Sequence, residues 1–432
     1  MYLKSKEIIY EKALTAALDI LNEGDRAQVL ALIAESLIAE GKLVEGGKIF
    51  TKALTVIKKI DNDRVFKVEA LTIVVESIGN SKEFSLKEAL YKKIFNVGQG
   101  ITNKSLQHAA LSAIISSYAR SGKLKEALES VDSIEEGWFR AVSLVAIVKE
   151  LAAAGEIEEA LSVVKRIEKV HISRVSALLI IAEALSKQND SVWSKKLYEK
   201  ALLLSQKIGD SSDKASAWLE IANSLAVNGD LAQALDVAEN IHEPLYRVRA
   251  LVSIAKIFNA KKNIDKSKSL YEQAIYVAGN MENILFKSRA LLEISEALAD
   301  NEDFEGALDL VKVIEDNYCQ AEALVSISKH LADDGEFDRA LSISRGIEED
   351  LFRSSGLFAV AEALAYSGNF KKALAVREEI DDEYCKEQVS VALAKAFCGM
   401  GNFKKALAVA EKIKDKGCQA EAFLAIAREF KN

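Results

Sequence analysis

Cysteine and histidine are the side chains best suited to metal binding or nucleophilic catalysis, and the chain holds four of each. Cys319, Cys385 and Cys418 occupy equivalent positions in segments of the sequence that repeat. Stacked repeats would place these thiols on separate layers, too far apart for one tetrahedral metal site. We interpret them as buried plugs, because a free cysteine behaves as a small hydrophobic side chain. No C-x-x-C motif is present, which is typical of a reducing compartment.

The histidines are no better placed for joint chemistry, because His108, His171, His242 and His330 share no position in the repeats. No Ser/His/Asp grouping, phosphate-binding loop or metal-ligand spacing occurs in the sequence. Acidic residues are abundant, but they fall on predicted exposed helix faces. A catalytic pair of carboxylates there has the same sequence pattern as ordinary solvent-exposed acidic residues. The sequence therefore predicts no cofactor, no metal and no catalytic residues, and we expect a protein that is not an enzyme.

The chain has 432 residues, one proline and a net charge of −8. No Gly/Ser-rich or low-complexity stretch divides it, which favours a continuous repeat array over several domains. A phosphate backbone needs a basic face, and no Lys/Arg run exceeds a pair, so nucleic acid is a disfavoured partner. The first residues lack the apolar core of a signal peptide, and the longest apolar stretches are too short to span a membrane. We expect a cytoplasmic protein without membrane contact.

One nine-residue segment, Gly-Asn-Phe-Lys-Lys-Ala-Leu-Ala-Val, occurs at Gly368–Val376 and again at Gly401–Val409 and marks the repeated unit. Its glycine ends the first of two predicted helices, and residues that tolerate a left-handed backbone recur at this turn. Large apolar residues stand eleven, eight and four positions before the turns, with Ser390 as the one exception, and this spacing is one face of an α-helix. The turn residues are Gly41, Lys82, Gly122, Gly155, Asn189, Gly229, Lys262, Glu302, Gly335, Gly368 and Gly401.

A second helix follows each turn and often carries an Ala-Leu pair, as at Ala373-Leu374. Turns are 33–34 or 40–41 residues apart, and we assign the extra length of the long units to this second helix. In long units it carries an aromatic residue and then an alanine, as at Tyr198 and Ala201. Short units instead close with isoleucine, an aromatic or cysteine-containing pair, and a basic or amide residue, as in Trp138-Phe139-Arg140.

These features resemble the tetratricopeptide repeat (TPR) over essentially the whole chain. For the first half of the motif the match is best at Trp218, Ala222, Leu225, Gly229 and Ala234. The resemblance implies an all-α fold, a right-handed superhelical solenoid of about 12 helix-turn-helix repeats and about 24 helices. It further implies that first helices line the concave face and bind a protein or peptide partner there.

We expect one TPR-like solenoid over residues 1–432, with an N-terminal half unit at 1–22, eleven repeats of 33–41 residues at 26–419 and a C-terminal capping helix at 420–432. The N-terminal half unit matches a second helix without a first, and the C-terminal one matches a first helix without a second. A polar cap is what a solenoid end requires. The alternative is that the last helix completes the half unit of another molecule, giving head-to-tail self-association instead of the expected monomer.

Two columns of the first helices are candidate binding surfaces. Six positions before the turn, charges alternate from Lys256 to Lys395 and predict a ladder that sets register or recognises polar groups of a partner. Ten positions before the turn, an apolar stripe is either a groove for an apolar peptide or packed core, and small residues nearby favour packing. The partner-binding candidates are Val252, Lys256, Leu292, Glu296, Val325, Lys329, Phe358 and Glu362.

The function predicted from these features is a non-catalytic protein–protein interaction scaffold or adaptor that binds its partner on the concave face. Two alternatives stay open, a helical-repeat RNA-binding protein and a subunit of a helical-repeat enzyme. Binding to RNA would weaken steeply with salt. An enzyme subunit would need a deep pocket with convergent acids or a metal, and the sequence shows neither.

Overall fold

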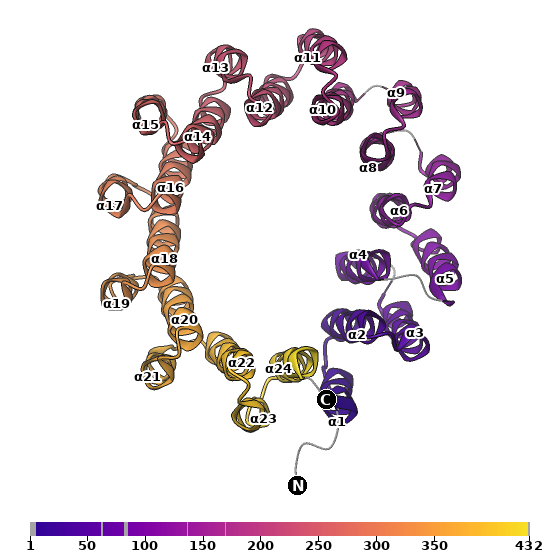
Figure 1. The fold of residues 1–432 in the computed structure, drawn as a ribbon, viewed down its shortest axis with the longest axis vertical. Coiled ribbons are helices and arrows are strands. Elements are labelled where there is room, and N and C mark those ends of the chain that lie inside the picture. Colours follow the sequence, from indigo (N-terminus) through magenta and orange to yellow (C-terminus); the bar gives the residue numbers. More distant parts are fainter. Residues whose placement is uncertain (1–5, 62–63, 82–84, 136, 169, 431–432) are drawn as a thin grey trace. The chain divides into compact units, whose positions relative to one another are not determined.

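The protein is all-α in a computed structural model, which describes residues 6–61, 64–81, 85–135, 137–168 and 170–430. These residues form 24 α-helices and one short 3₁₀ helix, and no strand occurs among them (Figure 1). The fold class predicted from the repeats, an α-solenoid with about 24 helices, is confirmed. Two compact units divide the chain: unit 1 comprises Met1–Ala177 with Ser390–Asn432, and unit 2 comprises Leu178–Val389.

Unit 1 alternates first helices, which precede a turn, with second helices, which follow it. The first helices wholly within it are α2 (Glu23–Ala39), α4 (Val65–Asn80), α6 (Lys104–Arg120), α8 (Trp138–Ala154) and α24 (Lys416–Glu429). Its second helices are α1 (Lys6–Leu18), α3 (Leu43–Lys59), α5 (Lys87–Gln99), α7 (Leu124–Ser130) followed by η1 (Val131–Ser133), α9 (Ile157–Lys165) and α23 (Phe403–Ala410).

Unit 2 has the same alternation. Its first helices are α12 (Ser211–Val227), α14 (Pro244–Ala260), α16 (Ile284–Asp300), α18 (Asn317–Asp333) and α20 (Asp350–Tyr366). Its second helices are α11 (Ser191–Ser205), α13 (Leu231–Glu239), α15 (Ile264–Gly279), α17 (Phe304–Val311), α19 (Phe337–Arg345) and α21 (Phe370–Glu379). Two further first helices, α10 (His171–Lys187) and α22 (Glu383–Gly399), contain the boundaries between the units. Within unit 2 the even-numbered helices form one layer and the odd-numbered helices the other (Figure 1).

The predicted turns close as expected. Every predicted turn residue that the structure describes has a positive φ, between 62° and 95°. Most are glycine, which adopts this conformation without steric cost, whereas Asn189, Lys262 and Glu302 adopt it with a side chain present. At Gly41 the following amide, of Lys42, donates to the carbonyl of Leu37 and satisfies the helix end. The turn predicted at Lys82 lies outside the described residues.

The two unit lengths differ in the second helix, as predicted. Long units have second helices of 17, 13, 15 and 16 residues, namely α3, α5, α11 and α15. In the short units α9 and α13 have 9 residues each and α23 has 8. The extra turns give a long second helix room for an aromatic residue that reaches the next first helix.

Tyrosine hydroxyls make that contact. The hydroxyl of Tyr198 shares a 2.9 Å hydrogen bond with the hydroxyl of Ser224, and Asn301 donates to the hydroxyl of Tyr271 at 2.7 Å. Burial raises the pKa of Tyr271 to about 12, so this hydroxyl stays neutral at physiological pH. Tyr10 and Tyr91 make equivalent hydrogen bonds in unit 1. The aromatic residue of a long second helix therefore ties one hairpin to the next.

The basic or amide residue that closes each unit also has a structural role. In six units its side chain donates to the carbonyl of the isoleucine six or seven residues earlier, where the second helix has ended. This capping satisfies a carbonyl that no helix partner reaches. The pairs are Arg26 with Ile20, Lys67 with Ile60, Gln107 with Ile101, Arg140 with Ile134, Arg353 with Ile347 and Gln419 with Ile413.

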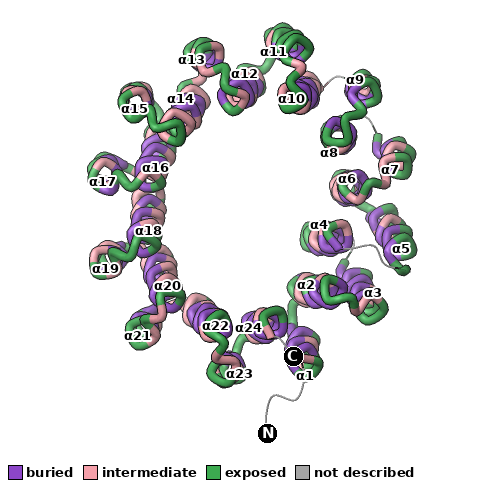
Figure 2. Tube along the Cα trace, in the orientation of Figure 1, coloured by how far each residue is buried: buried purple, intermediate pink, exposed green. Residues whose placement is uncertain are grey.

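The apolar core runs between the two layers of helices. Figure 2 shows buried residues on the sides of helices that face other helices, with exposed residues on loops and outer sides. The column eight positions before the turn is the deepest, and Ile33, Ile147, Ile254 and Val360 are at most 1% exposed. Burying one such side chain contributes about 1.5–3 kcal/mol. The residues eleven, eight and four positions before each turn therefore form the core side of the first helices.

The two ends of the chain pack together within unit 1. Helix α24 lies against α1 and also contacts α2 (Figure 1). Arg428 donates to Ser36 at 3.3 Å, and the ammonium of Lys12 lies 5.6 Å from the ring centre of Phe423. Helix α1 is a second helix without a first, and α24 is a first helix without a second. Each therefore buries its own apolar face against the other. The predicted polar cap at 420–432 is thus wrong, since α24 completes the N-terminal half unit of its own chain.

Candidate interaction site on the first-helix face

The eight predicted partner-binding residues lie on four successive first helices of unit 2. Neighbouring helices in this series pack against one another. Each helix carries one apolar and one charged residue four positions apart, so both side chains share a face. The pairs are Val252 and Lys256 on α14, Leu292 and Glu296 on α16, Val325 and Lys329 on α18, and Phe358 and Glu362 on α20.

The apolar members of these pairs differ in accessibility. Val252 is 7% exposed and Leu292 is 0% exposed, whereas Val325 and Phe358 are half-buried. The interpretation of the whole stripe as a binding groove is therefore wrong at Val252 and Leu292. Their side chains fill the contact between neighbouring first helices and cannot reach a partner. An apolar anchor is accessible at Val325 and Phe358.

The predicted ladder of opposite charges does not form at Lys256. Its ammonium lies 2.6 Å from a carboxylate oxygen of Asp300, one helical turn beyond Glu296. The same offset recurs in unit 1, where Arg120 pairs with Glu76 at 3.1 Å. In both pairs a residue six positions before one turn meets a residue two positions before the next. Neighbouring first helices are therefore shifted by about one helical turn, ~5.4 Å, at these long units.

A second charged network joins the same helices near their N-terminal halves. Arg249 on α14 donates to both carboxylate oxygens of Glu293 on α16, at 2.9 and 2.7 Å. Arg289 also contacts Glu293, at 3.4 Å, and reaches Glu322 on α18 at 3.1 Å. A bidentate Arg–carboxylate pair is the strongest of these contacts and fixes the relative orientation of α14 and α16.

The pKa values of two carboxyl groups in this region are shifted in opposite directions. Burial acts to raise the pKa of Asp300, but Lys256 and His330 more than offset it and hold the pKa below its ordinary value. His330 contacts Asp300 at 2.7 Å. Burial, followed by the charge of Glu322, raises the pKa of Glu296. The ionised Asp300 thus stabilises the fold until acid protonates it, whereas ionisation of Glu296 at higher pH opposes folding.

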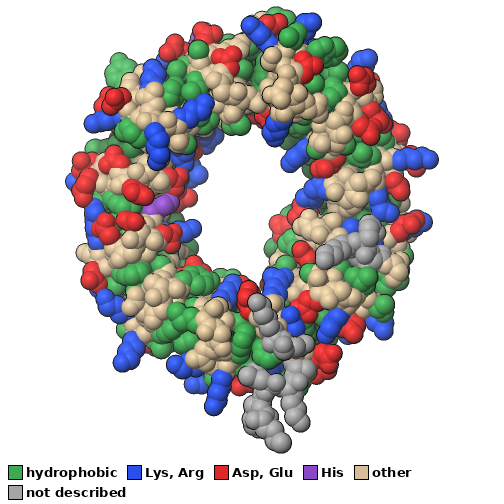
Figure 3. Space-filling model, in the orientation of Figure 1, with side chains coloured by type: hydrophobic (Ala, Val, Ile, Leu, Met, Phe, Trp, Pro, Cys, Tyr) green, Lys and Arg blue, Asp and Glu red, His purple; other side chains and the backbone are tan. Residues whose placement is uncertain are grey.

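The ammonium group of Lys329 remains available to pair with a carboxylate of a binding partner. It is exposed and has no ion pair with any residue that the structure describes, unlike Lys256. Acidic and basic side chains are interspersed over the face shown in Figure 3, without a broad region of one sign. Sequence columns missed Arg249, Asp300 and His330 as network members. The signal that would have found Arg249 and Asp300 is opposite charge at an offset of four positions between neighbouring units, whereas His330 meets Asp300 at an offset of three positions in the other direction.

A model of the PPR repeat family matches residues 109–136 and 391–418. Each matched segment contains one positive-φ turn, at Gly122 and Gly401, between a first and a second helix. The chain is a TPR-like helical-repeat protein. No curated protein matches the sequence.

Several solved structures resemble these TPR-like repeats at low identity. Human IFIT1, solved as a dimer with PPP-AAAA, is 14% identical, with 94% of each chain covered and a TM-score of 0.32. The STAND protein PH0952 from Pyrococcus horikoshii, which has a tetratricopeptide repeat sensor, is 13% identical over 95% of this chain and 65% of its own, with a TM-score of 0.30. Aspartyl phosphate phosphatase F from Bacillus subtilis is 15% identical over 81% of this chain and 92% of its own, with a TM-score of 0.29. At these scores the likenesses carry no argument about function.

The cysteines and histidines of the TPR-like repeats remain apart. Cys398 and Cys418 are buried, but Cys319 and Cys385 are half-buried, so the prediction of fully buried plugs is wrong for these two. Burial raises the pKa of Cys319 and of Cys385 to about 11, which disfavours the reactive thiolate. Among the described residues, no group of three or more His, Cys, Asp or Glu side chains is placed to hold a metal ion. None of the described helices combines the length and apolar character needed to cross a membrane.

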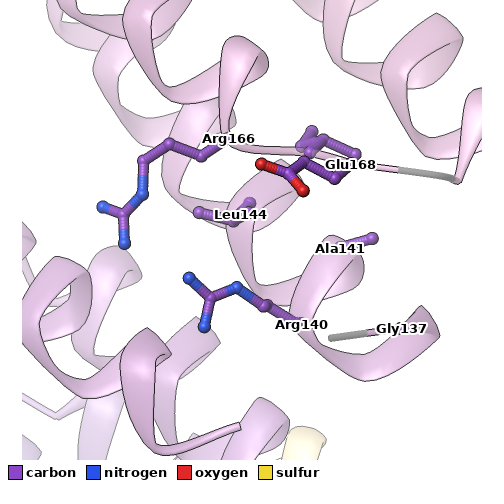
Figure 4. Close-up of a pocket in the computed structure, with 7 residues that line it drawn as sticks. Gly137, Arg140, Ala141, Leu144, Arg166 and Glu168 are labelled. Atoms are coloured by element: carbon purple, nitrogen blue, oxygen red, sulfur yellow. The ribbon is translucent and has the colours of Figure 1, made fainter. Parts of the chain in front are cut away.

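A small cavity of about 50 Å³ lies between the start of α8 and residues 166–168, which follow α9, in unit 1 (Figure 4). The guanidinium groups of Arg140 and Arg166 extend toward the same side of it (Figure 4), and both contact Asp132, at 2.8 and 3.0 Å. Arg140 also donates to the carbonyls of Val131 and Ile134. Because this is the capping contact repeated along the chain, we interpret the cavity as a by-product of unit closure and not as a ligand site.

The capping role predicts that Arg140→Gln is tolerated and Arg140→Leu is not. Gln419 makes the same two contacts in its own unit, to the carbonyls nine and six residues earlier, so glutamine has the required reach. Loss of both hydrogen bonds in Arg140→Leu is expected to lower the free energy of unfolding by about 1.5–3 kcal/mol, and Arg140→Gln by less than ~1 kcal/mol. Urea unfolding followed by circular dichroism measures both. Equal losses in the two variants would mean that the charge of Arg140, and not carbonyl capping, matters here.

Proposed function

We propose that this TPR-like chain is a non-catalytic scaffold that binds a protein or peptide partner on the first-helix face of unit 2. The observation that carries the proposal is the group formed by Val325, Lys329 and Phe358 on the adjacent helices α18 and α20. Two half-buried apolar side chains and an exposed lysine without an ion pair among the described residues lie on these two helices, which pack together. Interfaces are anchored by such apolar contacts with a polar rim.

Binding on this surface would be passive docking. The charged networks around Glu293 and Asp300 hold α14, α16 and α18 in place, and α20 packs on α18, which supports a surface formed before a partner arrives. Phe358 and Val325 supply apolar anchors, Lys329 pairs with a carboxylate or carbonyl of the partner, and Lys256, Glu296 and Glu362 form the polar rim. The four free cysteines support a cytoplasmic place of action, because thiols stay reduced there.

The test is capture of partners from native cytosol by the wild-type chain and by the double variant Val325→Asp/Phe358→Asp, read by mass spectrometry. We expect the variant to lose a defined set of proteins while its circular dichroism spectrum stays unchanged. The matched control is Val192→Asp/Leu203→Asp, which places the same charges on the exposed outer side of α11. If the Val325→Asp/Phe358→Asp variant captured the same proteins as the wild type, the first-helix face would not be the binding surface.

RNA is the second candidate partner, on the ground that two segments match a model of the PPR repeat. Proteins built from PPR repeats read one base per helical repeat. The net charge of −8 weighs against this candidate. Treatment of the captured material with ribonuclease decides between the two. Capture that survives ribonuclease supports the protein scaffold, and capture that disappears, together with a steep salt dependence, supports RNA binding.

A further inference from the structure

One edge of unit 2 carries a row of exposed hydrophobic side chains away from the first-helix face described above. Leu285, Tyr318, Leu351 and Tyr384 stand at the same position in four successive units, at the N-terminal ends of α16, α18, α20 and α22, and are 64%, 69%, 65% and 62% exposed. We call these four residues the edge ridge. Large apolar residues gathered in this way mark interaction surfaces.

Contacts between the helix starts keep the edge ridge continuous. The amide of Asp316 donates to the hydroxyl of Ser288 at 3.1 Å, which joins the start of α18 to α16. Arg353 on α20 lies 3.4 Å from Asp381, just before α22. The rings of Tyr318 and Phe352 meet edge to face, with centres 6.1 Å apart. Since neighbouring helices pack ~8–10 Å apart, the ridge extends for roughly 30 Å.

The ridge is bordered by acidic residues. The segments 282–287, 315–320, 348–353 and 381–386 together contain nine carboxylates and three cations. This is an excess of six negative charges in a chain whose net charge is −8. The three cations already have partners: Lys287 pairs with Glu315, Arg353 with Asp350, and Lys386 with Glu383. Complementarity therefore requires a partner that is positively charged as well as apolar.

The backbone of the ridge selects the form of that partner. At the starts of α16, α18 and α22 the amide that an extended peptide would contact already bonds to a side chain, of Asn283, Asp316 and Asp382 respectively. An extended peptide would leave its own backbone groups unpaired here, whereas a helix satisfies them internally. Seven residues of an α-helix advance ~10.5 Å, close to the spacing of the ridge residues.

We propose that the edge ridge of unit 2 binds a cationic amphipathic α-helix of a partner protein, whose apolar residues recur every seventh position. Each apolar residue of that helix contacts one hydrophobic member of the ridge. Lysine or arginine side chains on either flank pair with the acidic residues that precede the first helices, such as Glu282 and Glu348. This surface is separate from Val325, Lys329 and Phe358, so it allows two partners at once.

The experiment uses the full chain and a dye-labelled synthetic helix of about 24 residues, ~36 Å long, with leucine at every seventh position and lysine on the flanks. Fluorescence anisotropy measures its binding to the wild type and to Tyr318→Ser/Leu351→Ser, whose substituted side chains are 69% and 65% exposed, and circular dichroism checks that the variant is folded. We expect the double variant to weaken binding at least about tenfold. The matched control, Leu203→Ser/Tyr276→Ser, removes side chains that are 62% and 74% exposed on second helices of unit 2 and is expected to bind as the wild type does.

Two further peptides make the test decisive. A peptide of the same composition with its leucines scattered, and one with glutamate in place of lysine, are both expected to bind at least about tenfold more weakly than the regular cationic helix. The proposal is overturned if either binds equally well or if the ridge and control variants behave alike. Self-association of the chain that Tyr318→Ser/Leu351→Ser abolishes, without peptide binding, would assign the ridge to a second copy and overturn it too.

Discussion

Leu292→Asp is expected to unfold unit 2, with a loss of more than about 4 kcal/mol in the free energy of unfolding. The side chain of Leu292 is 0% exposed and lies on α16, which packs between α14 and α18. A carboxylate there would be buried without a cation to pair with it, and the apolar contact would be lost as well. Circular dichroism and urea unfolding measure the effect.

The matched control is Val325→Asp, which makes an equivalent apolar-to-acidic change at the same position of the next first helix. Val325 is half-buried, so the new carboxylate stays in contact with water, and we expect a loss of less than ~1.5 kcal/mol. A fold that tolerated both changes would show that the apolar column is an open groove throughout. Unfolding by both would show that it is core throughout and would remove Val325 and Phe358 as binding residues.

Phe423→Ala is expected to destabilise the first and the last helix of the chain, α1 and α24, together. Phe423 is 4% exposed on α24, and truncating a buried phenylalanine costs about 3–5 kcal/mol. Because α1 buries its apolar face against α24, residues 6–18 should lose protection from hydrogen exchange along with residues 416–429, although the two segments lie at opposite ends of the sequence. Hydrogen–deuterium exchange with mass spectrometry reads both segments in one experiment.

Phe304→Ala is the control for this prediction. Phe304 is 7% exposed on α17 in unit 2, so the same chemical change is made at similar burial in an ordinary hairpin. We expect it to weaken protection near α16 and α18 and to leave α1 unchanged. Unchanged protection of α1 in Phe423→Ala would mean that the packing of α1 on α24 contributes nothing to the stability of either helix.

The local architecture could be predicted from the sequence because it depends on neighbouring residues. The left-handed turns follow from glycine or asparagine at fixed intervals, and even at Lys262 and Glu302 the repeat spacing identified the turn despite the unfavourable residue type. Second-helix length follows from the interval between turns, as α15 and α17 illustrate with 16 and 8 residues. These are relations over a few helical turns, and the pattern of apolar residues specifies them directly.

The candidate site could be predicted in part. Alignment of the repeats on their turn residues placed Val325, Lys329 and Phe358 on one face of neighbouring helices. It did not tell Val325 from Leu292, which has the same position in its unit but is fully buried. It also paired Lys256 with Glu296, whereas the shift between α14 and α16 brings it to Asp300. Burial and ion pairing between units depend on how one hairpin is displaced against the next, which no residue pattern within a unit records.

The sequence by itself determined the repeated hairpin, its two lengths and the residues that face its core, because each is set by contacts within a unit or with the adjoining unit. The tertiary structure alone decided that α1 and α24 meet. That contact joins residues such as Ser36 and Arg428, which are 392 positions apart. Whether two helices so distant in the sequence pack together is not recorded by local periodicity, because that pattern specifies only contacts within a unit or with the adjoining unit.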